Sequence, residues 1–205
     1  MRFILLGLFS LLFFFSAGSR AAPQPNTLVA ERLEAVAAGS GTSLEFREYR
    51  TSSLFTEPVV YTGRLEVNLS ENSLTKWIDS PEPARMTLTA TDIEMQTGES
   101  RVRRISLRQR PEMAAFVSSM LSLMQGDVDA LEKVFDVLYW ELPDSTWKLR
   151  LRPRERRVAN RVSELTISGC SDQLQMLTTE MADGDVQTLE IISRIAECGS
   201  PNDDP

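Results

Sequence analysis

Residues 44–69 read LEFREYRTSSLFTEPVVYTGRLEVNL, and the second half of this stretch is the clearest strand in the chain. From residue 64 onward, apolar and polar side chains alternate with a period of two, which gives a strand one dry face and one wet face. One face carries Leu65, Val67 and Leu69, and the other carries Arg64, Glu66, Asn68 and Ser70. A similar strand begins at residue 44 but loses this phase at Arg47 and Glu48. The stretch predicts two strands joined by a turn at 54–58, with an apolar face that must be covered.

The rest of the chain continues this pattern in short apolar runs separated by turn residues such as Ser80-Pro81-Glu82-Pro83 and Ala182-Asp183-Gly184-Asp185. Strands connected so closely are normally antiparallel neighbours, and a sheet of ten or eleven strands usually curls. The sequence therefore predicts a mainly β protein of the α+β class. We expect strands at 44–50, 59–69, 74–79, 86–90, 92–96, 102–108, 136–142, 146–152, 161–168, 173–181 and 186–195.

Three segments have the helical period instead. The first begins at Asn26 or Thr27 and ends near Gly39, with Val29, Leu33 and Val36 on one stripe. The second runs from Pro111 to Gly126, and the third begins at Asp127. Two helices inserted between strand runs predict a lid over the sheet. The broad stripe of the second helix fits either ordinary packing on the sheet or contact with acyl chains; it consists of Met113, Phe116, Val117, Met120, Leu123 and Met124.

The first residues have the composition of an export signal. Arg2 precedes an apolar run at 3–15, and small residues at Ser19 and Ala21 suit a signal peptidase. The run is shorter than the roughly 20 residues of a bilayer-spanning helix, although an uncleaved anchor is the alternative. We expect residues 1–21 to be a signal peptide cleaved near Ala21, residues 22–198 to form one domain, and 199–205 to be a disordered tail. Such a protein would reside in the periplasm.

The charge of the chain is acidic, with 22 basic and 29 acidic residues and a formal net charge of −7. Removal of the signal would take two arginines, leaving 20 basic against 29 acidic residues, or −9. This balance argues against nucleic acid or an anionic membrane surface as the main partner.

The chain contains two cysteines, Cys170 and Cys198. In an oxidising compartment such a pair most simply forms one disulfide, worth roughly 3–4 kcal/mol by the chain-entropy estimate. Two separate buried thiols are the alternative. Neither cysteine belongs to a CxxC pair, which argues against redox catalysis.

Catalytic chemistry has little support in this sequence. The chain has no histidine, so neither a Ser-His-Asp nor a Cys-His system can be built. Carboxylate pairs such as Asp92 with Glu94 fit a solvated strand face better than a general acid and base. We expect no enzymatic activity, no cofactor and no metal site.

Arginine is concentrated in two clusters despite the acidic total. Guanidinium groups suit phosphate and carboxylate oxygens, so the clusters could dock an acidic partner or a lipid head group. The alternative is that they form outer strand faces paired with glutamates. The first cluster is Arg101, Arg103, Arg104, Arg108 and Arg110, and the second is Arg150, Arg152, Arg154, Arg156, Arg157 and Arg161.

The order of these parts resembles the periplasmic lipoprotein carriers of the LolA type, in particular a divergent LolA-like branch. The resemblance covers roughly 44–195 and rests on Leu44-x-Phe46-x-x-x-Arg50, Leu54, Glu57-Pro58, Gly63-x-Leu65-x-Val67, the helix break at Gly126-Asp127, and Trp147-x-Leu149-x-Leu151-x-Pro153. It implies an incomplete antiparallel β-barrel closed by short helices around an apolar cavity that shields acyl chains. By pattern, the cavity lining would be Leu44, Phe46, Leu65, Val67, Leu69, Met86, Leu88 and Ile105 from the sheet and Phe116, Met120 and Leu123 from the lid.

The resemblance implies a monomeric carrier that ferries lipoproteins from an inner-membrane exporter to an outer-membrane acceptor. The well-known carriers have an arginine and a proline-led aromatic segment after the second long strand, where this chain reads Leu69-Ser70-Glu71-Asn72-Ser73-Leu74. No arginine carries over at that place, so a glycolipid or polyene-type lipid is an alternative cargo. A periplasmic assembly or scaffold protein with a filled interior is the alternative outside the carrier class, and a hydrolase of lipid or envelope polymer is a third.

Overall fold

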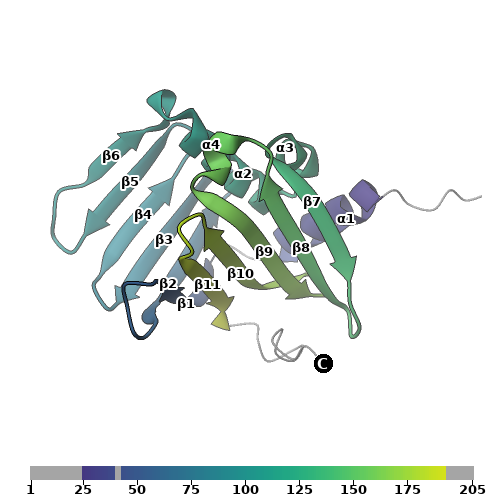
Figure 1. The fold of residues 1–205 in the computed structure, drawn as a ribbon, viewed down its shortest axis with the longest axis horizontal. Helices are drawn as coiled ribbons and strands as arrows, with labels where there is room; N and C mark the ends of the chain where they lie inside the picture. The colour runs from purple at the N-terminus through teal and green to yellow at the C-terminus, as the bar shows by residue number, and fades with distance from the viewer. Residues whose placement is uncertain (1–24, 40–42, 193–205) are drawn as a thin grey trace, which may run out of the picture.

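The computed structural model describes residues 25–39 and 43–192, which form one antiparallel sheet and a set of helices (Figure 1). The strands are β1 (Ser43–Thr51), β2 (Val59–Asn68), β3 (Ser73–Ser80), β4 (Ala84–Leu88), β5 (Asp92–Thr97), β6 (Arg103–Ser106), β7 (Phe135–Glu141), β8 (Thr146–Pro153), β9 (Val162–Cys170), β10 (Gln173–Met181) and β11 (Val186–Ile191). The helices are α1 (Pro25–Gly39), α2 (Pro111–Gln125), α3 (Val128–Val134) and α4 (Arg156–Ala159), and a 3₁₀ turn, η1, spans Leu107–Gln109.

The sheet has the order β6-β5-β4-β3-β2-β1-β11-β10-β9-β8-β7, and neighbouring strands run antiparallel. It does not close, because β6 and β7 form its two edges. The prediction of an incomplete antiparallel barrel of ten or eleven strands is therefore confirmed.

Strands β1 and β11 join the two halves of the sheet. They pair antiparallel, with Phe46 opposite Ile191 and Arg50 opposite Gln187. Because of this pairing, β6 and β7 are the edge strands at opposite ends of the sheet. The segment between them, which contains η1, α2 and α3, must cross from one edge to the other.

Three apolar clusters occupy the face of the sheet that the helices cover, which we call the inner face. One cluster joins α1 and α3 to β7, β8 and β9, a second joins α2 to β4, β5 and η1, and a third lies on β1 and β11. Their buried residues are Val29, Leu33, Val36, Met120, Val128, Leu131, Phe135, Trp147, Leu149, Leu151, Val162, Leu165 and Ile167; Leu88, Ile93, Leu107, Val117 and Leu121; and Leu44, Phe46, Leu189 and Ile191. Helix α2 thus packs against two clusters at once.

Helix α2 starts at Pro111, which suits a first helical turn, and ends at Gly126. Gly126 has a φ of +74°, the left-handed conformation that glycine adopts without strain. A β-carbon at this position would lie 3.0 Å from the backbone nitrogen of Glu34 in α1. The turn between α2 and α3 is therefore in close contact with the backbone of α1.

Three details differ from the sequence-based expectation. The strand predicted at 102–108 ends at Ser106, and Leu107–Gln109 form the 3₁₀ turn η1, with Leu107 buried. Helix α4 was not predicted, because four residues are too few to display a helical period. The predicted loss of phase at Arg47 and Glu48 is wrong: exposed and buried residues alternate through β1, and Glu48 is buried in line with Leu44 and Phe46. Residues 193–195 of the last predicted strand, like 1–21 and 199–205, lie outside the described ranges.

Glu48 is buried because basic groups on the same face accompany it. It is 3 % exposed and accepts hydrogen bonds from Lys76 Nζ of β3 and, at 2.5 Å, from Arg50 Nε. Lys76 is itself 8 % exposed, with its ammonium 4.7 Å from the centre of the Phe46 ring. Burial lowers the pKa of the Lys76 ammonium, and the negative charge of Glu48 opposes that shift. The inner face therefore carries a paired charge cluster beside its apolar core.

A methyl group added at Gly63 should destabilise the sheet, since it would collide with the backbone of β3. A β-carbon at Gly63 would lie 1.9 Å from the carbonyl oxygen of Trp77, beside a register shift between β2 and β3. We expect Gly63→Ala to lower the free energy of unfolding by about 1–3 kcal/mol in chemical denaturation. Val60→Ala, at an exposed position of the same strand, is the control, with an expected change of about 0.5 kcal/mol. Equal losses in both variants would contradict the tight approach of the strands at Gly63.

Removal of the Glu48 carboxylate should be strongly destabilising, because it leaves the Lys76 ammonium buried without its partner. We expect Glu48→Ala to lower the free energy of unfolding by about 3–5 kcal/mol. Glu45→Ala, at an exposed position of β1, is the matched control and should change it little. The double variant Glu48→Leu/Lys76→Met should recover most of the loss, since an apolar pair can replace a buried ion pair. A Glu48→Ala variant as stable as Glu45→Ala would show that the pair does not contribute.

Candidate functional site

An apolar cavity lies between the inner face of the sheet and the helices α2 and α4. Its volume is about 460 Å³, within the roughly 300–1,000 Å³ of sites that hold small organic ligands. Both halves of the sheet contribute to its wall. The lining residues are Met86, Leu88, Ile93, Arg110, Met113, Phe116, Val117, Val158, Arg161, Val162, Thr179, Met181 and Gln187.

The apolar wall follows from strand register and from the start of α2. Leu88 and Ile93 are directly paired across β4 and β5, so both side chains point to the inner face. Helix α2 adds Met113, Phe116 and Val117 from its first two turns, which face the sheet because the helix spans the inner face. Aliphatic and thioether side chains of this kind adapt to irregular apolar guests. This part of the wall therefore offers hydrocarbon a mainly apolar surface.

The cavity lining contains few polar residues, and its charged residues are both basic. Thr179 and Gln187 are directly paired across β10 and β11 and form a polar strip in the wall. The charged lining residues are Arg110, next to α2, and Arg161, just before β9. No acidic residue stands among the described residues of this lining. The described lining thus combines an apolar wall with a polar strip and two basic side chains.

The arginines of the two sequence clusters lie in two kinds of surroundings, beside acidic residues or at the cavity. Most of the paired members lie on outer strand faces beside acids: Arg104 bonds to Glu94, Arg152 Nε lies 2.7 Å from Glu164 Oε2, and Arg154 Nη2 lies 3.0 Å from Asp136 Oδ1. These pairs fit the interpretation of solvated strand faces. Each cluster, however, also sends one arginine to the cavity.

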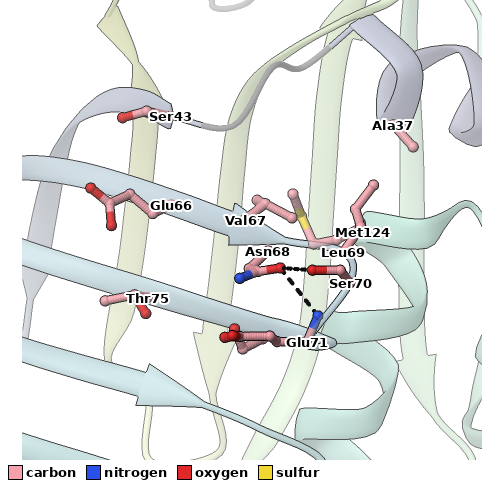
Figure 2. A pocket seen from close by; sticks show the side chains of 11 residues that line it. Ala37, Ser43, Glu66, Val67, Asn68, Leu69, Ser70, Glu71, Thr75 and Met124 are labelled. Carbon is pink, nitrogen blue, oxygen red and sulfur yellow. Dashed lines mark hydrogen bonds between the residues drawn. The ribbon is translucent and has the colours of Figure 1, made fainter.

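A second hollow of about 730 Å³ lies at the β2–β3 turn (Figure 2). Asn68 Oδ1 there accepts hydrogen bonds from Ser70 Oγ at 2.7 Å and from the backbone nitrogen of Glu71 at 3.1 Å. Its wall is largely polar, with Glu66 and Glu71 present, and Ser43 in that wall directly follows residues 40–42, which are not described. We assign no guest to this hollow.

The eleven predicted lining residues are divided among several places. Met86, Leu88 and Phe116 line the apolar cavity, and Val67 and Leu69 line the second hollow. Leu44 and Phe46 belong to the cluster on β1 and β11, where Leu65 packs against them; Met120 belongs to the cluster of α1 and α3, where Leu123 packs, and Ile105 packs against the cluster of α2. Lipid binding at any of these positions stays a prediction.

Most of the cavity wall was missed in the sequence-based list. Met113 and Val117 belonged to the predicted apolar stripe of the second helix, and that stripe was the signal for them. Val162, Thr179 and Met181 come from the C-terminal half of the sheet, and the sequence alone does not place this half opposite β4 and β5. Cys170 is buried at the end of β9, while Cys198 lies outside the described residues, so the Cys170–Cys198 disulfide stays a prediction.

The described residues contain neither a metal-binding cluster nor a membrane-spanning helix. No group of three or more His, Cys, Asp or Glu side chains in 25–39 and 43–192 is placed to hold a metal ion. In the same ranges, none of the helices has the length and hydropathy needed to span a membrane.

One family model matches most of this chain. The family model described as outer membrane lipoprotein carrier protein LolA-like matches residues 21–198. No curated protein sequence matches this chain. Among solved structures, a LolA superfamily protein from Nitrosomonas europaea is 12% identical, with 82% of this chain and 91% of that chain covered and a TM-score of 0.42. The lipoprotein LppX of Mycobacterium tuberculosis is 12% identical, with 82% and 94% covered and a TM-score of 0.43.

A third similar structure is a DUF1329 family protein from Desulfovibrio piger, 10% identical, with 82% of this chain and 91% of that chain covered and a TM-score of 0.45. The family match spans the whole described sheet and its helices, and the open eleven-stranded sheet agrees with it. The chain therefore belongs to the LolA-like family of outer membrane lipoprotein carrier proteins.

Proposed function

We propose that this protein is a periplasmic carrier that buries the acyl chains of lipoproteins or related lipids and ferries them from the inner to the outer membrane. The observation that carries the proposal is the apolar cavity of about 460 Å³ between α2 and the inner face. Membership of a lipoprotein carrier family supports it. The inner-membrane donor and the outer-membrane acceptor are part of the proposal, as is export of the chain.

The energetics of such a carrier follow from hydrocarbon burial. Each methylene group transferred from water into an apolar site gains about 0.8 kcal/mol, so an acyl chain leaves a membrane only for a comparable apolar environment. Met86, Leu88 and Phe116 supply that environment in the cavity. Binding and release then need no covalent step, since the guest exchanges one apolar environment for another.

Helix α2 is the element that would regulate access. It covers the cavity with Phe116 and Val117, and it reaches the sheet from a connection between two edge strands. Movement of its first turns would open the cavity without breaking any pairing within the sheet. The cargo could be a lipoprotein, or a glycolipid or polyene-type lipid, since 69–74 lacks the arginine that the well-known carriers have at that place.

A bulky side chain inside the cavity should reduce acyl-chain binding. Met86 lines the cavity, while Val60 of β2 is 41 % exposed and lines neither the cavity nor the second hollow. We expect Met86→Trp to weaken the affinity for a fluorescent fatty acid by about tenfold, since displacing two methylenes forfeits about 1.6 kcal/mol. Val60→Trp should bind as the wild type does. Fluorescence titration measures both, with thermal unfolding as the check on folding.

Native mass spectrometry of protein purified from a periplasmic extract gives the complementary test, because a carrier should retain lipid. The proposal fails if wild-type protein takes up no fatty acid and carries no lipid, or if the two tryptophan variants bind equally well.

A further inference from the structure

Arginines that are distant in the sequence meet at one end of the apolar cavity. Arg110 precedes α2 and Arg161 follows α4, and both line the cavity. Arg161 also lines an adjoining hollow with Pro111, Arg157 and Asn160. Helix α4 packs against α2 (Figure 1). Arg157 lies in α4 and Arg161 follows it, while Arg110 directly precedes α2. The cavity thus has an apolar interior and an arginine-bearing mouth.

These three arginines have no acidic counterpart among the described residues. None of them takes part in an ion pair with a described side chain, a set that leaves out Glu112, and no described acidic residue lines the cavity or the adjoining hollow. The Nη1 atom of Arg110 lies 3.8 Å from the sulfur of Met113. Arg104, Arg152 and Arg154, from the same two clusters, do pair with acids. Other exposed arginines of the two clusters, such as Arg101 and Arg103, also form no ion pair among the described residues, so the distinguishing feature of Arg110 and Arg161 is that they line an apolar cavity.

We propose that the cavity binds an anionic amphiphile, with its hydrocarbon chain in the apolar interior and its carboxylate or phosphate group at Arg110, Arg157 and Arg161. This inference rests on the proposed function and adds the charge of the guest to it. Guanidinium groups donate forked, charge-assisted hydrogen bonds that match carboxylate and phosphate oxygens. The apolar wall supplies affinity for any chain, and the arginines select the anionic head group.

The test compares guests that share a chain and differ in head group. Palmitate, hexadecanol and monopalmitoyl glycerol phosphate are each titrated as competitors against a fluorescent acyl probe bound to the full-length protein. The concentrations stay below those at which the competitors form micelles. We expect palmitate or the phosphate to compete at least about tenfold better than hexadecanol, the gain of a charge-assisted contact. The stronger of the two anions identifies carboxylate or phosphate as the head group. Added salt should weaken the anions and leave hexadecanol unchanged.

Arginine variants locate the effect. Arg110→Gln and Arg161→Gln should each weaken the anions by about tenfold and leave hexadecanol binding unchanged, which also shows that the cavity is intact. Arg101→Gln is the control, since Arg101 is exposed and lines no described cavity. Equal competition by hexadecanol and the anions, or equal losses for all guests, would overturn the head-group inference while the proposed function stands. No displacement by any guest, with no uptake of the probe, would overturn both.

Discussion

Strands β1 and β11 come from distant parts of the sequence, yet they form backbone pairs from Phe46–Ile191 to Thr51–Val186. This pairing makes one sheet from two meanders, each of which would otherwise end in an open strand. The pairing leaves β6 and β7 at the two edges of the sheet. The segment that connects them therefore has to cross the inner face. The position of α2, and with it the cavity, is therefore a consequence of one non-local strand pairing.

The inner face combines apolar packing with buried charge. The Glu48–Lys76 pair adjoins the cluster around Phe46, and Arg50 of the same group lies opposite Gln187 in the cavity wall. Replacing a buried ion pair by apolar residues is often neutral or stabilising, so stability alone does not account for this one. Its position suggests a role in register, since a one-residue slip of β1 would turn Glu48 to the outside and leave Lys76 without its partner.

The local elements were predictable from the sequence because periodicity reports on them directly. The alternation at Leu65 and Val67 located β2, and the stripe containing Phe116 and Met120 located α2. The phase of β1 was not predictable, because a glutamate is expected to be exposed unless a buried basic partner is known. Lys76 lies on another strand, and only the fold brings the two side chains together.

The site was predictable in part, for a similar reason. Met86, Leu88 and Phe116 were expected to face a common interior, and the structure places them on one cavity wall. The opposite wall, with Thr179 and Met181, depends on strand order and not on any local pattern. The arginine clusters were visible in the sequence, but their separation into acid-paired members and members at the cavity depends on the position of α4 against α2.

Gly126 has a consequence for how a guest would enter. The turn at this residue lies close to the backbone of α1, and we expect this contact to restrain the C-terminal end of α2. Its N-terminal end, at Pro111, adjoins the cavity and the neighbouring arginines. Any opening would therefore pivot about Gly126 and lift the Pro111 end first. An amphiphile entering there would insert its hydrocarbon chain first, and its head group would remain beside the arginines near Pro111.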